Sequence, residues 1–122
     1  MTDLLAGRRV LVVEDEMVIL MMIEGMLEDL GCGSVTAAAT IDQALGFIDA
    51  QPFDVAMLDL NLDGQRTYPV ADRLAARNVP FLFSTGYSDH GLKEGYGDRP
   101  VLKKPFQMVE LAELLQRLLK AV

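Results

Sequence analysis

Short apolar runs alternate with longer amphipathic stretches along the chain, and this alternation restricts the possible folds more than any other feature. Arg9–Val13, Val55–Leu58 and Phe81–Phe83 are continuous runs of β-branched or bulky residues. Such runs are typical of strands that are buried on both faces of a sheet. Ser34–Ala38 and Val101–Leu102 are less bulky runs of the same kind. We therefore expect five strands.

Four longer stretches have the apolar spacing of helices. They are Met17–Leu30, Ile41–Ala50, Tyr68–Arg77 and Gln107–Lys120. Gly31 directly follows the first stretch, where a glycine commonly ends a helix. Strands that alternate with helices predict a parallel sheet covered by helices on both faces. The expected fold is therefore α/β, a doubly wound five-stranded parallel sheet of (βα)5 type.

The length and composition indicate one globular domain. We expect residues 1–122 to form a single domain, with 1–7 as a flexible N-terminal extension. A 51% hydrophobic and 24% charged composition excludes a disordered chain, and no apolar run reaches the roughly 20 residues that cross a bilayer. The net charge of −7 argues against nucleic acid and anionic membranes as partners. A single cysteine, Cys32, and the lack of a signal peptide indicate a cytoplasmic protein.

Polar residues stand where the expected strands end, and ligand sites of such sheets lie outside the carboxyl ends of the strands. These residues are Glu14, Asp15, Asp59, Asn61, Thr85 and Lys104. Neighbouring carboxylates repel each other unless a cation lies between them, and oxygen ligands favour Mg²⁺. An ammonium and a hydroxyl suit the oxygens of a transferring phosphoryl group. The pattern predicts phosphoryl transfer onto a carboxylate.

The sequence resembles the receiver domains of response regulators in two-component signalling, over nearly its whole length. Glu14-Asp15, Asp59, Thr85 and Lys104-Pro105-Phe106 carry the resemblance, each closing its own strand in this order. It implies a flavodoxin-like receiver fold and, at Lys104-Pro105, a cis peptide bond. Because the chain ends soon after its last expected helix, we expect a single-domain response regulator.

The resemblance also implies the roles of the site residues. Asp59 would be the phosphoacceptor, and Glu14, Asp15 and Asp59 would hold Mg²⁺ together with the backbone carbonyl of Asn61. Lys104 would pair with the phosphoryl group, and Thr85 would sense it. The donor would be a sensor histidine kinase or a phosphotransfer protein, while the downstream protein partner is not indicated. Such a chain promotes its own phosphorylation and dephosphorylation and is not a turnover enzyme.

The run Pro80–Tyr87 resembles the stand-alone "FATGUY" subgroup of receivers, with Ser84 in place of alanine. Members of this subgroup are similar in lacking the aromatic switch residue of the last strand, and Val101 occupies that position here. Tyr87 is our candidate for a replacement switch. The segment from Gly86 to Gly97 contains four glycines, which predicts a short or partly melted helix that phosphorylation orders.

Three other functions compete with this interpretation. A flavodoxin-like cofactor binder needs a phosphate cradle after the first strand, where Glu14 and Asp15 offer repulsion instead. An aspartyl phosphatase needs a second Asp two residues after its nucleophile, and Asn61 occupies that position. A phosphorylation-independent adaptor on the same fold stays open. An apolar strip at Val18 and Met22 is either a docking surface for the donor or a region covered by a loop.

Overall fold

A parallel five-stranded sheet forms the centre of the protein in the computed structural model, which describes residues 4–86, 96 and 99–120. The strand order is β2-β1-β3-β6-β7, and every neighbouring pair is parallel. The strands are β1 (Arg9–Val13), β2 (Ser34–Ala38), β3 (Val55–Asp59), β6 (Phe81–Thr85) and β7 (Val101–Lys103). Because β1 lies between β2 and β3, the chain adds strands on both sides of it, which confirms the predicted doubly wound sheet.

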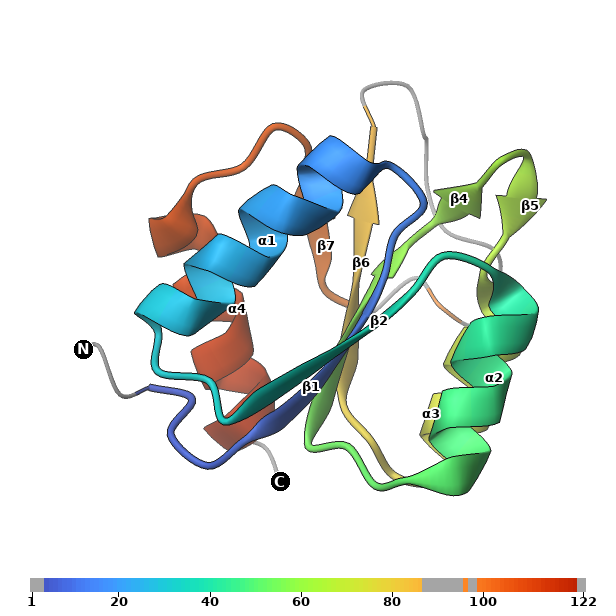
Figure 1. The fold of residues 1–122 in the computed structure, drawn as a ribbon, viewed down its shortest axis with the longest axis horizontal. Helices are drawn as coiled ribbons and strands as arrows, with labels where there is room; N and C mark the ends of the chain where they lie inside the picture. Colours follow the sequence, from blue (N-terminus) through green and yellow to red (C-terminus); the bar gives the residue numbers. More distant parts are fainter. Residues whose placement is uncertain (1–3, 87–95, 97–98, 121–122) are drawn as a thin grey trace.

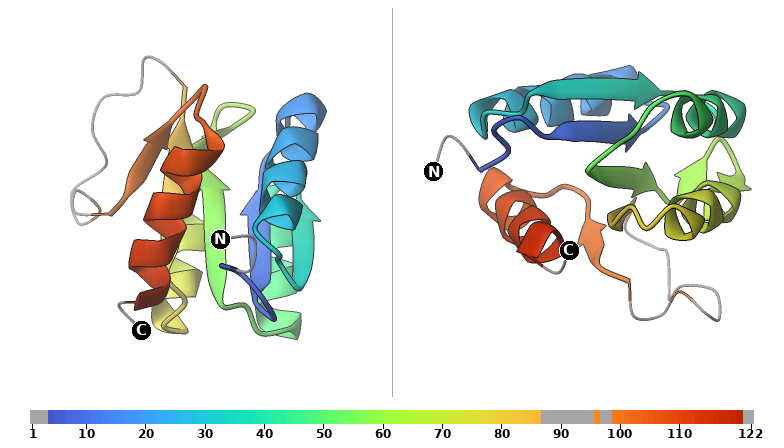
Figure 2. Two further views of the ribbon diagram at one scale, coloured as in Figure 1. Left: turned by 90° about the vertical axis from the view of Figure 1, so that its left-hand side faces the viewer. Right: turned by 90° about the horizontal axis from the view of Figure 1, so that it is seen from below.

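Helices cover both faces of this sheet (Figures 1 and 2). The helices are α1 (Met17–Asp29), α2 (Ile41–Ala50), α3 (Tyr68–Ala76) and α4 (Met108–Lys120). Helices α1 and α4 lie on one side, and α2 and α3 lie on the other. None of the described helices has the length and apolar character that a bilayer crossing requires.

Alternation along β1 divides the apolar core into two clusters. Val10 and Val12 pack with residues of α1 and α4, whereas Leu11 and Val13 pack with residues of α2 and α3. Successive side chains of a strand point to opposite faces, so a continuous apolar run serves both layers at once. Burying both faces in this way fixes the register of the strand that carries Glu14 to the site.

A short antiparallel hairpin, which the sequence analysis does not predict, follows β3. It consists of β4 (Asn61–Leu62) and β5 (Gln65–Arg66). Its two turn residues, Asp63 and Gly64, have positive φ values of 47° and 87°. A two-residue turn with positive φ at both positions matches the twist of a hairpin, and Asp-Gly is a favoured pair there. Strands of only two residues show no hydrophobic alternation, which is why the pattern missed them.

Residues 4–7 also differ from the expected flexible extension. The side chain of Leu5 is fully buried, and its amide donates a hydrogen bond to the carbonyl of Leu30 at 2.9 Å. Ala6 forms an isolated antiparallel bridge with Cys32. The apolar side chain of Leu5 joins the cluster beneath α1 and α4, and this burial holds the segment in place. The predictions for the segment after Gly86, including that for Tyr87, concern mostly residues 87–95 and 97–98, which lie outside the described residues.

An ion pair between Arg9 and Asp54 joins the beginnings of β1 and β3. The Arg9 amide donates to Asp54 Oδ2 at 2.7 Å, and its guanidinium donates to both carboxylate oxygens at 3.1 Å. The hydrogen bonds from Arg9 lower the pKa of Asp54, although partial burial acts in the opposite direction. A carboxyl whose pKa is lower in the folded protein stabilises the fold above its unfolded pKa.

We expect Asp54→Ala to lower the free energy of unfolding by about 1 kcal/mol at pH 7. The difference from the wild type should shrink as the pH falls below about 4, through the folded pKa, because the protonated carboxyl attracts Arg9 less. Urea unfolding of both proteins from pH 7 down to about pH 3 measures this difference. A difference that stays constant or grows on acidification contradicts the assignment.

Candidate functional site

Three acidic side chains meet at the carboxyl ends of β1 and β3. These strands are adjacent and in register, with Val13 opposite Leu58, so Glu14 and Asp59 leave the sheet at the same edge. One carboxylate oxygen from each of Glu14, Asp15 and Asp59 lies within 4.8 Å of the others. Glu14 and Asp59 are buried, with 1% and 6% of their surface exposed, whereas Asp15 is exposed. Water therefore reaches the cluster from the side of Asp15.

Lys104 brings a positive charge to this cluster and directly follows β7, the edge strand of the sheet. Its Nζ donates to Glu14 Oε1 at 2.9 Å and to Asp59 Oδ2 at 3.2 Å. The backbone amide of Lys104 donates to the carbonyl of Thr85 at 2.8 Å, which fixes the residue just beyond β7. The peptide bond from Lys104 to Pro105 is cis, as the resemblance implied.

The electrostatics of the cluster favour an additional cation. Burial raises the pKa of Glu14, the charge of Asp59 raises it further, and the hydrogen bond from Lys104 opposes both effects. Burial lowers the pKa of Lys104, but the hydrogen bond to Glu14 and the charges of Asp59 and Glu14 outweigh it, so the pKa is raised. One ammonium faces three carboxylates. The site therefore has an excess of negative charge that a divalent cation would balance.

Thr85 adds a buried hydroxyl at the same edge. It is the last residue of β6, and its neighbour Ser84 is opposite Asp59 in the sheet. Only 3% of Thr85 is exposed, and its Oγ1 has no hydrogen-bond partner within the described part of the chain. Because buried polar groups are nearly always hydrogen-bonded, this hydroxyl indicates an acceptor that binds there.

The donor set fits magnesium. Carboxylate oxygens in small number, one of them open to water, are the ligands that Mg²⁺ prefers. The buried hydroxyl of Thr85 and the ammonium of Lys104 suit the oxygens of a phosphoryl group beside such a cation. The geometry therefore suits phosphoryl transfer to Asp59. Asn61 lies beside the cluster, and its amide donates to Asp59 Oδ1 at 3.2 Å.

Comparison with known proteins agrees with this arrangement. The response regulator receiver domain family matches residues 10–116, which span all the described site residues. The chain belongs to this family. It is therefore a receiver domain of the kind that functions in two-component signalling, and the predicted family and fold are confirmed.

Several known receiver domains are similar to this one. SdrG from Sphingomonas melonis Fr1 is 44% identical, with 92% of this chain and 96% of SdrG covered and a TM-score of 0.83. The receiver domain of sensor histidine kinase PA1611 from Pseudomonas aeruginosa PAO1 is 29% identical, with coverages of 94% and 99% and a TM-score of 0.74. The PA1611 structure has a magnesium ion coordinated in its active site cleft.

A longer curated relative is the transcriptional regulatory protein YvrH from Bacillus subtilis (strain 168). It is 29% identical over 115 residues, which are 91% of this chain and 48% of YvrH. This receiver domain thus spans about half the length of that relative.

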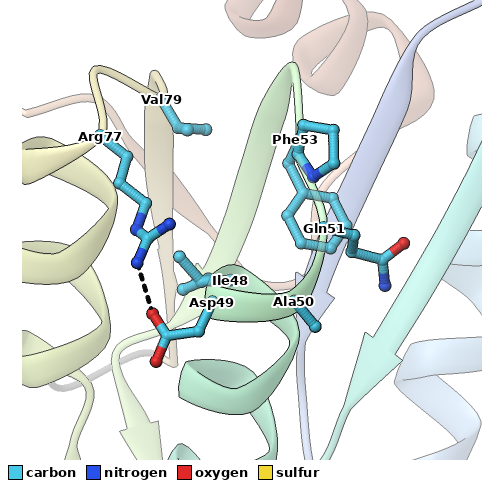
Figure 3. A pocket seen from close by; sticks show the side chains of 8 residues that line it. Ile48, Asp49, Ala50, Gln51, Phe53, Arg77 and Val79 are labelled. Atoms are coloured by element: carbon cyan, nitrogen blue, oxygen red, sulfur yellow. Dashed lines mark hydrogen bonds and ion pairs between the residues drawn. The ribbon is translucent and has the colours of Figure 1, made fainter.

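A pocket at the opposite end of the sheet is separate from the acidic site (Figure 3). It has a volume of about 430 Å³ and lies beside Phe53 and Val79, which precede β3 and β6. Arg77 Nη2 pairs with Asp49 at 2.7 Å across its mouth, and Arg73 pairs with the same carboxylate at 2.6 Å. The hydrogen bond from Arg73 lowers the pKa of Asp49. These contacts join α2 to α3, so the pocket is part of the helix packing of the receiver domain.

Sequence reasoning missed one buried polar residue of the site, Thr67. Its hydroxyl donates to the backbone carbonyl of Asp59 at 2.8 Å. The only signal in the sequence was that Thr67 follows shortly after Asp63-Gly64. This signal points to the site only if the β4–β5 hairpin is known, and the sequence analysis did not predict that hairpin. Tyr87, the candidate switch, lies outside the described residues and stays a prediction.

Proposed function

We propose that this receiver domain accepts a phosphoryl group onto Asp59, in a Mg²⁺-dependent reaction, from a sensor histidine kinase or a phosphotransfer protein. The phosphorylated domain then signals through contacts with other proteins. One observation carries the proposal: the Asp59 carboxylate lies beside an ammonium and two further carboxylates, at the sheet edge where Thr85 also ends its strand. With a divalent cation on the carboxylates, this set would neutralise a phosphoryl group, whereas so many charged groups have no evident role in an ordinary strand end.

In the proposed reaction, a carboxylate oxygen of Asp59 attacks the phosphorus of a phosphohistidine. A P–O bond forms, the P–N bond breaks, and the imidazole leaves with the electron pair. Lys104, 3.2 Å from Asp59 Oδ2, neutralises charge on the transferred oxygens. Magnesium, held by Glu14, Asp15 and Asp59 with the carbonyl of Asn61, would supply further neutralisation. Water later hydrolyses the acyl phosphate, so the chain is both reactant and product rather than a turnover enzyme.

The product contains an acceptor for the Thr85 hydroxyl. A phosphoryl oxygen is a strong hydrogen-bond acceptor, and Thr85 Oγ1 is buried without a partner among the described residues. We infer that Thr85 reports the phosphorylated state by moving toward that oxygen, with Tyr87 as the candidate residue that responds. The assignment to the FATGUY subgroup is part of the same proposal.

An exposed apolar surface beside the site fits a protein donor. Met17, Val18 and Met21 at the start of α1 are 67%, 81% and 63% exposed, directly after the acidic residues. Large apolar side chains gathered on a surface indicate a contact with another protein. We infer that the phosphodonor docks there, in the cytoplasm. The net charge of −7 argues against a nucleic-acid partner.

The proposed function is tested by incubating the protein with Mg²⁺ and acetyl phosphate, followed by intact-mass analysis. We expect a single phosphoryl adduct that hydroxylamine removes and that does not form with EDTA. Absence of an adduct at any donor concentration would contradict the proposal. It would favour the phosphorylation-independent adaptor, for which Asp59→Ala should leave the affinity for a partner unchanged.

Asp15 offers a test of the metal site that leaves the fold intact. Because its side chain is exposed, we expect Asp15→Asn to weaken Mg²⁺ binding about tenfold or more without changing the stability of the metal-free protein. Isothermal titration calorimetry measures the affinity, and Glu16→Gln is the matched control because Glu16 is the adjacent exposed acid. Equal Mg²⁺ affinities for the two variants would remove Asp15 from the metal site.

A further inference from the structure

Thr67 contacts the phosphoacceptor from a buried position that the proposed reaction does not use. None of its surface is exposed, and its Oγ1 donates to the Asp59 carbonyl oxygen at 2.8 Å. Its backbone amide donates to the Leu60 carbonyl oxygen at 3.1 Å. Thr67 therefore hydrogen-bonds to the carbonyl groups of both Asp59 and Leu60, the first through its hydroxyl and the second through its backbone amide.

The two peptide groups that Thr67 holds also make the contacts that orient Asp59. The first contains the Asp59 carbonyl and the Leu60 amide, which donates to the Ser84 carbonyl of β6 at 2.9 Å. The second contains the Leu60 carbonyl and the Asn61 amide, which donates to Asp59 Oδ1 at 3.2 Å. Each peptide group is rigid and planar, so fixing its carbonyl also fixes its amide. The Thr67 hydroxyl thus fixes the peptide group that directly follows Asp59, and it also lies 3.5 Å from the Leu60 carbonyl oxygen, which the Thr67 backbone amide holds.

The hairpin places Thr67 at this position. Strands β4 and β5 lead the chain away from Asp59 and return it within six residues through the Asp63-Gly64 turn. On its other side, the Thr67 carbonyl accepts hydrogen bonds from the amides of Val70 and Ala71, in the first turn of α3. Thr67 is therefore anchored by a helix as well as by the strand end.

We propose that Thr67 is a positioning residue for phosphorylation: its hydroxyl holds the Asp59 peptide so that the carboxylate faces the donor. The proposal rests on the proposed acceptance of a phosphoryl group by Asp59. Valine has nearly the shape of threonine but cannot donate a hydrogen bond, and water cannot replace the hydroxyl at a fully buried position. Serine keeps the donor and lacks only the methyl group.

The test compares Thr67→Val and Thr67→Ser with acetyl phosphate as the donor. We expect Thr67→Val to lower the maximal phosphorylation rate about tenfold, with the half-saturating donor concentration and the Mg²⁺ affinity within about twofold of wild type. Thr67→Ser should stay within about threefold of wild type. Ile23→Val, in the cluster beneath α1 and α4, controls for lost stability and should react at the wild-type rate. Thr67→Ala replaces Thr67→Val if the latter does not fold.

Hydrogen exchange gives a readout that does not depend on phosphorylation. In Thr67→Val, a peptide covering residues 59–66 should exchange faster than in the wild type or in Thr67→Ser. If Thr67→Val exchanges faster but is phosphorylated at the normal rate, the positioning role is overturned and the proposed function is not. The same holds if Thr67→Val and Thr67→Ser lose equal amounts of phosphorylation rate. Wild-type protein that takes no phosphoryl group would overturn the proposed function together with this role.

Discussion

Asp59→Asn is expected to abolish phosphorylation by acetyl phosphate. An amide oxygen is a far weaker nucleophile than a carboxylate, and the substitution also removes a negative charge that would attract the cation. Intact-mass analysis after incubation with Mg²⁺ and donor should show the adduct on the wild type and none on the variant. The side chain keeps its size, and Asp59 is 6% exposed, so the packing around it is maintained.

Asp63→Asn is the matched control for this experiment. Asp63 is an exposed acid in the turn that follows Asp59, and asparagine tolerates its φ of 47°. We expect this variant to form the adduct at the wild-type rate. Asp59→Asn should be at least as stable as the wild type without Mg²⁺, because one of two close buried carboxylates becomes neutral. An adduct of equal yield on Asp59→Asn would place the phosphoryl group on another residue.

Lys104→Met is expected to lower both the phosphorylation rate and the stability. The ammonium hydrogen-bonds to Glu14 and Asp59, both buried, and removing one partner of a buried ion pair typically costs about 3 kcal/mol. Losing a preorganised donor to the transferring oxygens lowers the rate about a hundredfold. Methionine keeps the length of the side chain, so the variant removes the charge and little volume.

Two assays separate these effects, with Lys103→Met as the control. Lys103 is exposed and adjacent, and it makes no hydrogen bond to the acidic cluster among the contacts of the described residues. Urea unfolding without Mg²⁺ measures the lost stability, and intact-mass time courses with saturating Mg²⁺ measure the rate. If Lys104→Met reacts as fast as Lys103→Met, the ammonium does not contact the transferring group.

The sheet and helices followed from hydrophobic periodicity because both faces of the sheet are covered. The bounds of β1, β2 and α2 match the expected ranges, since apolar runs and local caps define them; the Thr40 hydroxyl, for example, accepts the Gln43 amide at 3.1 Å. Strands β3 and β6 run further than their apolar residues, through Asp59 and Thr85. These polar residues break the hydrophobic pattern but continue the backbone ladder.

The acidic cluster could be predicted because the carboxyl ends of parallel strands share one edge of a sheet. That rule placed Glu14, Asp59 and Lys104 together without any knowledge of side-chain geometry. It did not identify Thr67, whose approach to Asp59 depends on a hairpin of two-residue strands. It also missed the burial of Leu5, because the apolar run Leu4–Ala6 is too short to show a periodicity.

The most direct measurement is a crystal structure of the protein bound to Mg²⁺ and beryllium trifluoride, an analogue of the phosphoryl group. Our account predicts the analogue on an Asp59 oxygen, with the cation against Asp15 and with Lys104 Nζ and Thr85 Oγ1 within hydrogen-bond distance of the fluorides. A structure in which the analogue binds elsewhere, or in which the Asp59 carboxylate turns away from Asp15 and Lys104 when the ligands are bound, would contradict it.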